Sequence, residues 1–203
     1  MKIINLEQNT PEWLKWRVQH CTATDAPKIL GKDRWTGIHD HWMKKMGFIE
    51  PEPVNEAMTR GTLLEPIARN LLCEKLQLDF EPMVVESSDY PWMGASLDGI
   101  SLSHSTICEI KCMKHSKHIQ VSKDTIDPCH YAQMQHQLAC TNAKMVYYVC
   151  YHPETPVPLK IIDIFPNKEY IEEMIEKEKE FFFETMCNME PTGDSWTFKQ
   201  KVR

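Results

Sequence analysis

Three charged side chains near the middle of the chain have the types and spacing of a metal-and-lysine site. Asp98, Glu109 and Lys111 lie in two short apolar runs, 97–102 and 107–112, that flank a polar Ser-His-Ser-Thr segment. This pattern predicts an antiparallel hairpin. Because side chains alternate between the two faces of a strand, all three project from one face. Two carboxylates there can share a hard divalent cation, with the ammonium group beside it.

The hairpin pattern also predicts a register, in which Asp98 lies opposite Lys111 and Ile100 lies opposite Glu109. The alternative is that these charges are only the solvated side of the hairpin, and Asp-Gly at 98–99 is also an ordinary turn dipeptide. The apolar residues around the charges favour a site, because charges within a buried strand need partners or a metal. The side chains on the other face are expected to enter a core: Cys108, Ile110 and Cys112.

A second set of candidate residues lies near the N-terminus. Thr-Pro-Glu at 10–12 is typical of a helix start, and Arg17 falls near the end of that helix. Another helix start is expected at 22–25. If Thr24 is its N-cap, the hydroxyl and the free amides form an anion site that Arg17 also reaches. The alternative is an ordinary surface arginine and an ordinary helix cap.

The remaining pattern predicts an α/β protein in which helices carry further polar candidates. Glu65 falls on an otherwise small, apolar face of a helix, where it is either a pocket residue or an acid at the edge of the core. Gln133 and Gln137 share one face of a later helix, a setting in which glutamines are usually inert. We expect helices at 41–46, 55–78 (kinked or restarted near Pro66), 128–141 and 168–186, strands at 80–86, 145–151 and 159–165, and a basic loop at 113–128.

The composition suits one globular domain of 203 residues, with 42% hydrophobic content. A net charge of −6 argues against nucleic-acid binding by bulk charge. The acidity is concentrated in 168–184, however, whereas 111–123 holds four lysines and no acid. Eight cysteines without a C-x-x-C pair, no apolar run long enough to span a membrane and no signal peptide favour buried thiols in a reducing cytoplasm.

Six short motifs resemble, in order and approximate spacing, those of the YqaJ-type viral recombinase family, the lambda-exonuclease-like phage alkaline exonucleases of the PD-(D/E)xK nuclease superfamily. The resemblance covers about 11–165 and implies a PD-(D/E)xK core, a central mixed sheet flanked by helices, in a single nuclease domain over 1–203. The helix and tail at about 167–203 are not diagnostic. The motifs are Trp13-Leu-Lys-Trp-Arg17, Thr22-Ala-Thr24, Arg60-Gly-Thr-Leu-Leu-Glu65, Ser96-Leu-Asp98-Gly99, Glu109-Ile-Lys111 and Ala132-Gln133-Met-Gln135.

The resemblance implies a metal site. Asp98 and Glu109 are expected to bind Mg²⁺, with the Ile110 carbonyl as a backbone ligand. Lys111 is expected to orient or activate the attacking water, with a pKa lowered by the nearby metal and by partial burial. Glu65 matches the carboxylate that serves a second metal or a metal-bound water. The cofactor is then Mg²⁺, with Mn²⁺ as a substitute and two ions in each active site.

The resemblance also implies a pocket for the 5′-phosphate of the cut strand, formed by Arg17, Thr24 and Ser96. Gln133 matches the glutamine that supports the nucleophile. Two positions depart from the family pattern, since Leu97 replaces the usual proline before the catalytic aspartate and Thr24 replaces a serine. Neither change removes a ligand oxygen.

The implied activity is 5′→3′ exonuclease action on linear double-stranded DNA, which leaves 3′ overhangs for a single-strand annealing protein in phage-type homologous recombination. The implied assembly is a homotrimeric ring around DNA, in the cytoplasm of a bacterial host and encoded by a phage or prophage. One alternative is an endonuclease with the same core, of resolvase or restriction type. Another is a non-catalytic module, rich in Cys and His, that binds zinc or an annealing protein.

Overall fold

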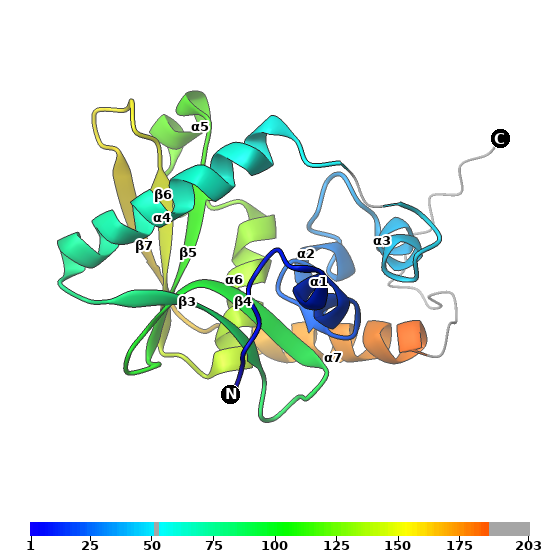
Figure 1. The fold of residues 1–203 in the computed structure, drawn as a ribbon. Helices are drawn as coiled ribbons and strands as arrows, with labels where there is room; N and C mark the ends of the chain where they lie inside the picture. Colours follow the sequence, from blue (N-terminus) through cyan, green and yellow to red (C-terminus); the bar gives the residue numbers. More distant parts are fainter. Residues whose placement is uncertain (51–52, 187–203) are drawn as a thin grey trace.

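A seven-stranded mixed sheet forms the centre of the computed structural model, which describes residues 1–50 and 53–186 (Figure 1). The strand order is β1-β3-β4-β5-β6-β7, and β2 pairs in parallel with β4. The β5–β6 pair is also parallel, and the other pairs are antiparallel. The strands are β1 (Lys2–Ile4), β2 (Cys21–Thr22), β3 (Phe80–Glu86), β4 (Met93–Ser101), β5 (Thr106–Cys112), β6 (Met145–Tyr151) and β7 (Leu159–Ile164).

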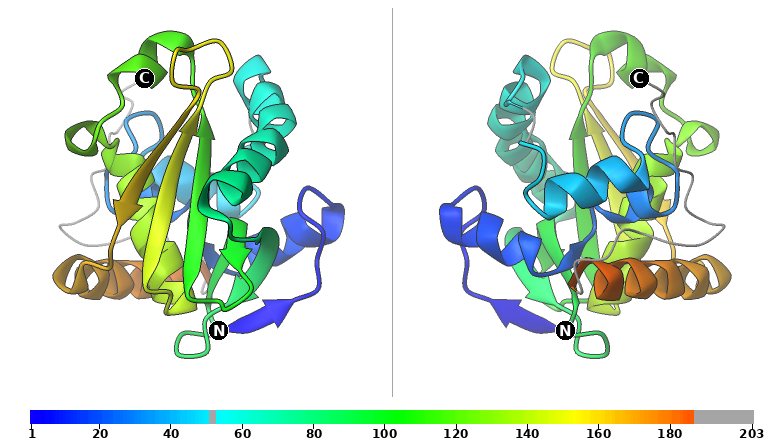
Figure 2. Two further views of the ribbon diagram at one scale, coloured as in Figure 1. Left: turned by 90° about the vertical axis from the view of Figure 1, so that its left-hand side faces the viewer. Right: turned by 90° about the vertical axis from the view of Figure 1, so that its right-hand side faces the viewer.

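Helices cover both faces of the sheet (Figures 1 and 2). On one face, α4 packs Ala68 and Leu72 against Cys108 and Ile110 of β5. On the other face, α6 and α7 contribute to a core that includes Ile107, and α2 packs against both helices. The helices are α1 (Pro11–Val18), α2 (Ala26–Ile29), α3 (Ile38–Lys45), α4 (Glu56–Leu76), α5 (His115–Gln120), α6 (Pro128–Thr141) and α7 (Lys168–Met186), with a 3₁₀ turn, η1 (Lys123–Thr125). The mixed α/β architecture predicted from the sequence is confirmed.

Local chemistry explains where the helices that carry candidate residues begin and end. Thr10 caps α1, as expected, and Asn55 caps α4 by accepting from the Met58 amide at 3.0 Å. Pro66 lies within α4 without ending it. Asn142, in a left-handed conformation with φ 57°, ends α6 at the predicted position.

The predicted hairpin register is wrong by two residues. Gly99 pairs with Cys108 and Ile100 pairs with Ile107, because the strands stop at Ser101 and Thr106 and leave a four-residue connection. A shift by an even number of residues keeps every side chain on its face. Glu109 and Lys111 therefore keep their common face, whereas Asp98 lies at an irregularity of β4, where the pairing with β3 shifts register between Glu81 and Met83.

Three other expectations need correction. Thr24 is not a helix cap, since Asp25 is the N-cap of α2, a helix of only four residues. The stretch 113–128 is not simply a loop, because α5 and η1 form within it, and α5 is anchored by His118, whose Nε2 lies 3.1 Å from the Cys150 carbonyl. Gly99 lies inside β4 and not in a turn.

The tail at 188–203, with its two aromatic residues, lies outside the described residues. Within residues 1–50 and 53–186, none of the helices combines the length and the apolar character needed to cross a membrane.

Candidate active site

The structure brings Asp98, Glu109 and Lys111 together at the β4–β5 hairpin, and we call them the carboxylate–lysine cluster. Lys111 Nζ forms an ion pair with Glu109 Oε1. Asp98 Oδ2 accepts a hydrogen bond of 2.7 Å from the Ile110 amide. Glu109 is 1% exposed, whereas the Lys111 side chain is 25% exposed. The lysine therefore lies at the solvent side of a buried carboxylate.

The local shape of the hairpin explains how Asp98 reaches the next strand. Backbone pairing between β4 and β5 stops after Gly99 and Cys108, so the Ile110 amide is available to the Asp98 side chain. Gly99 is required at this point because a Cβ there would lie 2.7 Å from Cys108 Sγ and 2.9 Å from Phe80 Cβ. The two strands lie close together at Gly99 and are no longer paired beyond it. The Asp98 side chain can therefore reach the Ile110 amide.

Two glutamines one turn apart on α6 hold the opposite ends of the Lys111–Glu109 pair. Gln133 Oε1 accepts from Lys111 Nζ at 3.1 Å, and Gln137 Nε2 donates to Glu109 Oε2 at 2.6 Å. The ammonium can only donate and the carboxylate can only accept, so the orientation of both amides follows. Gln137 is fully buried. The sequence indicated that the two glutamines share a face but not that Gln137 contacts Glu109.

On α4, Arg69 connects Glu65 to the cluster. Its Nη2 donates to Glu65 Oε1 and its Nε donates to the Asp98 carbonyl, both at 2.5 Å. The arginine thus fixes the backbone of one acid and the side chain of another. Sequence reasoning missed Arg69, and the only available signal was its position four residues after Glu65.

Burial and the negative charge of these acids together shift the pKa values of the site. Burial, followed by the charges of Glu109 and Glu65, raises the pKa of Asp98 well above its ordinary value. Burial also raises the pKa of Glu65, against the opposing charge of Arg69. Burial acts to lower the pKa of Lys111, but the charges of Glu109 and Asp98 outweigh it and raise that pKa. The expected lowering of the Lys111 pKa was for a site that holds a cation, and it stays a prediction.

The donor chemistry of the cluster fits a hard divalent cation. Asp98, Glu109 and Glu65 supply carboxylate oxygens, and their mutual repulsion is of the kind that a cation relieves. Glu109 Oε1 is buried and accepts no well-aligned hydrogen bond, although the Lys111 ammonium lies beside it. In the described part of the chain, no three Asp, Glu, His or Cys side chains are already arranged as a metal-binding group.

The structure also brings together Arg17, Thr24 and Ser96, which we call the anion pocket. Arg17 Nη2 donates to Thr24 Oγ1 at 2.6 Å, and the guanidinium carbon lies 4.4 Å from the centre of the Trp13 ring. Trp13 Nε1 in turn donates to Ser96 Oγ at 2.7 Å. Burial lowers the pKa of Arg17, against the charge of Asp25. Trp13 is thus the residue that joins the three predicted residues.

The anion pocket and the carboxylate–lysine cluster are neighbours on β4. Ser96 and Asp98 are two residues apart on β4, so their Cα atoms are about 6.6 Å from each other. A ligand that reaches Ser96 is therefore close to Asp98.

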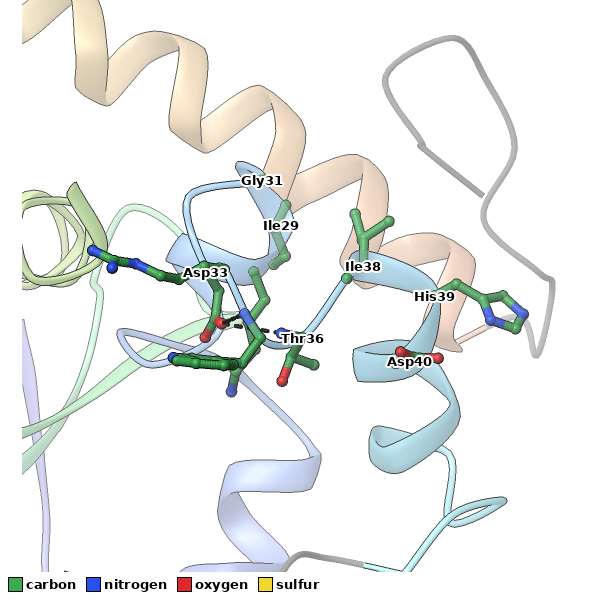
Figure 3. Close-up of a pocket in the computed structure, with 11 residues that line it drawn as sticks. Ile29, Gly31, Asp33, Thr36, Ile38, His39 and Asp40 are labelled. Carbon is green, nitrogen blue, oxygen red and sulfur yellow. Dashed lines mark hydrogen bonds between the residues drawn. The ribbon is translucent and has the colours of Figure 1, made fainter. Parts of the chain in front are cut away.

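A separate hollow of about 230 Å³ lies between α2 and α3, outside the candidate site (Figure 3). Its loop is shaped by Asp33, whose carboxylate accepts from the Trp35 and Thr36 amides at 2.8 and 3.1 Å. In Figure 3, the His39 ring points away from the hollow. The hollow contains none of the residues of the cluster or the anion pocket.

Comparisons with known proteins agree with the fold. The protein is similar to the crystal structure of an alkaline exonuclease, LHK-Exo, from Laribacter hongkongensis, with 24% identity, a TM-score of 0.78 and coverage of 88% of this chain and 94% of that chain. A structure of LHK-Exo in complex with dAMP matches with 25% identity, the same TM-score and the same coverage.

A curated relative, the uncharacterized protein YqaJ of Bacillus subtilis (strain 168), is 21% identical over 140 residues. These residues are 66% of this chain and 43% of the relative, so the chain spans less than half of that protein's length. The family model of the YqaJ-like viral recombinase domain matches residues 12–144, which include the anion pocket, both acids and the lysine of the cluster, and the two glutamines. The chain therefore belongs to the YqaJ-like viral recombinase family.

Proposed function

We propose that this protein is a metal-dependent deoxyribonuclease that degrades one strand of linear double-stranded DNA in the 5′→3′ direction. The observation that carries the proposal is the carboxylate–lysine cluster beside the anion pocket, with one residue of each, Asp98 and Ser96, on β4. The product is a 3′ overhang, which suits single-strand annealing in phage-type recombination. The whole chain, 1–203, acts as one nuclease domain in this proposal.

The proposed cation site uses Asp98, Glu109 and the Ile110 carbonyl, and Glu65 serves a second ion or a water bound to it. Mg²⁺ is the expected ion, with Mn²⁺ as a substitute, because the donors are hard oxygens. When bound, two such ions supply positive charge to the phosphodiester and lower the pKa of the attacking water.

In this proposal, the side chains of Lys111 and Gln133 position the attacking water. Lys111 holds the attacking water, since its ammonium lies beside Glu109 and is directed by the Gln133 side chain. Gln133 also supports the nucleophile. The raised pKa of Lys111 supports a role as a hydrogen-bond donor to the water. A cation held by the carboxylates would offset the charges that raise this pKa, and Lys111 would then release one proton to solvent before it accepts one from the attacking water.

The direction of digestion is proposed to come from the anion pocket. Arg17, Thr24 and Ser96 hold a terminal 5′-phosphate, and the neighbouring phosphodiester then lies at the cluster. Cleavage there releases mononucleotides one after another. The complex of the similar LHK-Exo with dAMP, a mononucleotide, supports this substrate class.

The proposed assembly is a homotrimeric ring around DNA. A chain with a net charge of −6 gains little from bulk attraction to a polyanion, so encirclement can replace part of the salt-sensitive contact. A single-strand annealing protein is the proposed partner. The seven described cysteines are all free, which suits the reducing cytoplasm of a bacterial host that carries a phage or prophage.

Digestion of linear and covalently closed circular DNA tests the activity. We expect Mg²⁺-dependent nucleotide release from linear duplex and intact circles. Nicking of circles would favour the endonuclease alternative. Stoichiometric zinc in the purified protein, with no nucleotide release, would favour the non-catalytic module.

A further inference from the structure

Lys45 of α3 is a buried lysine that takes no part in the carboxylate–lysine cluster. Its side chain is 6% exposed. The ammonium donates to the Arg17 carbonyl at 3.0 Å, to the His20 carbonyl at 2.7 Å and to Asp25 Oδ2 at 2.9 Å. Each of its three hydrogens can therefore reach an acceptor, and Lys45 ties the end of α1 to the residue before α2.

Asp25 is the anionic centre of these contacts. Its Oδ2 also accepts from the amide and the hydroxyl of Thr22, at 2.8 and 2.9 Å, and its Oδ1 lies 3.1 Å from His41 Nε2. Burial acts to raise the pKa of Asp25, but the charges of Lys45 and His41 outweigh it and hold that pKa well below its ordinary value. The carboxylate is thus ionised and buried, and its Oδ2 accepts three hydrogen bonds.

The contacts of Lys45 and Asp25 close into a ring that includes Arg17. The Thr22 hydroxyl lies 3.3 Å from Thr24 Oγ1, which accepts from the Arg17 guanidinium at 2.6 Å. Lys45 binds the Arg17 carbonyl and completes the ring through Asp25. Both the backbone and the side chain of Arg17 are consequently fixed by the same network.

A buried ion pair is poor evidence for a stabilising role, because the loss of hydration offsets most of the attraction between the charges. The segment it holds has little regular structure of its own, since α2 has only four residues and β2 has two. The network reaches the anion pocket through Arg17 and Thr24. These observations favour a role in orienting the pocket.

We infer that Lys45 and Asp25 are positioning residues that fix Arg17 and Thr24 in the geometry needed to bind a terminal phosphate group. The inference rests on the proposed function and assigns the selection of phosphorylated ends to residues outside the pocket. Loss of the network leaves Arg17 present but free to adopt other rotamers, so it binds phosphate less well.

The test uses the full chain with the substitution Lys45→Met, which removes the ammonium and keeps an unbranched side chain. The measured quantity is kcat/KM on 5′-phosphorylated duplex divided by kcat/KM on 5′-hydroxyl duplex. We expect this ratio to fall about tenfold in Lys45→Met and inhibition by inorganic phosphate to weaken by a similar factor, about 1.4 kcal/mol. Lys15→Met, at an exposed position on α1, removes the same charge and should keep the wild-type ratio.

A double-mutant cycle distinguishes positioning from a separate contact. If Lys45 acts through Arg17, then adding Lys45→Met to Arg17→Ala lowers the ratio no further. Additive effects, or a wild-type ratio in folded Lys45→Met, would overturn the inference. If Lys45→Met does not fold, Asp25→Asn provides the same test, since it keeps the shape of the side chain and removes its charge, and a wild-type ratio there overturns the inference equally.

The Arg17→Ala variant alone distinguishes failure of the proposed phosphate pocket from failure of the positioning role. A changed ratio in Arg17→Ala with an unchanged ratio in Lys45→Met leaves the proposed function in place and refutes the positioning role. An unchanged ratio in Arg17→Ala refutes the phosphate pocket, and the positioning role falls with it.

Discussion

The carboxylate–lysine cluster and the anion pocket are neighbours on β4 but are held in place by different means. Regular elements carry the cluster, with acids and lysine on paired strands and supporting side chains four residues apart on α4 and α6. The anion pocket is formed where α1 ends and an irregular segment begins, and buried hydrogen bonds from α3 fix it. Regular strands and helices position the cluster, whereas hydrogen bonds between residues far apart in the sequence position the anion pocket.

This difference predicts separate consequences for mutation. Changes in the cluster should affect metal binding or the chemical step on every substrate. Changes in the anion pocket or its supports should affect which DNA end is chosen. The following variants test this separation, beginning with the largest expected effect.

Asp98→Ala should abolish both binding of a divalent cation and hydrolysis. The substitution removes a carboxylate that accepts a hydrogen bond from the Ile110 amide, on a residue whose backbone carbonyl accepts from the Arg69 guanidinium. Titration calorimetry with Mg²⁺ measures the first effect directly. If the variant binds Mg²⁺ with wild-type affinity, Asp98 is not a ligand of the proposed cation site.

Lys111→Ala should lower kcat by about 10³-fold, the middle of the range for a lost acid–base group. DNA binding and Mg²⁺ binding should be largely kept, because both proposed carboxylate ligands remain. Single-turnover rates at saturating DNA measure the chemical step. Lys144→Ala, at an exposed position, is the matched control, and near-normal turnover in Lys111→Ala would refute its role.

Gln137→Leu should weaken Mg²⁺ binding about 10- to 100-fold, the usual effect of losing a partner that orients a metal ligand. The reason is that Glu109 Oε2 loses its donor at 2.6 Å in a fully buried setting. The ratio of rates on phosphorylated and hydroxyl ends should stay unchanged. Gln120→Leu, an exposed position on α5, should leave both quantities as in the wild type.

Arg17→Ala should lower the preference for 5′-phosphorylated over 5′-hydroxyl ends by about tenfold, as expected for one charge-assisted contact. Mg²⁺ affinity should not change, since the arginine contacts none of the proposed ligands. Competition between the two labelled duplexes in one reaction measures the preference. A selective loss of metal binding would contradict the separation of the two sites.

Sequence periodicity was sufficient for Glu109 and Lys111 because the alternation of side chains tolerates an even register error. The hairpin pairs two residues away from the predicted position, yet these two residues keep their common face and Asp98 accepts from the Ile110 amide between them. The limits of α6 also followed from local signals, with Pro128 at the start and Asn142 at the end.

The contacts that position the sites could not be predicted in the same way. Arg69, Gln137 and Lys45 each reach residues 20 or more positions away, and such pairings depend on how the helices dock onto the sheet. The assignment of Thr24 as a helix cap was wrong because Thr24 Oγ1 accepts from Arg17, and Asp25 takes the N-cap position. In an irregular segment, several polar residues compete for the same role.

The most direct test of the central proposal is digestion of one linear duplex that carries separate labels at its 5′ and 3′ termini, with and without Mg²⁺. We expect early release of the 5′ label as a mononucleotide, late release of the 3′ label, and release of neither label without the cation. Early release of the 3′ label, or release of either label without a divalent cation, would contradict it.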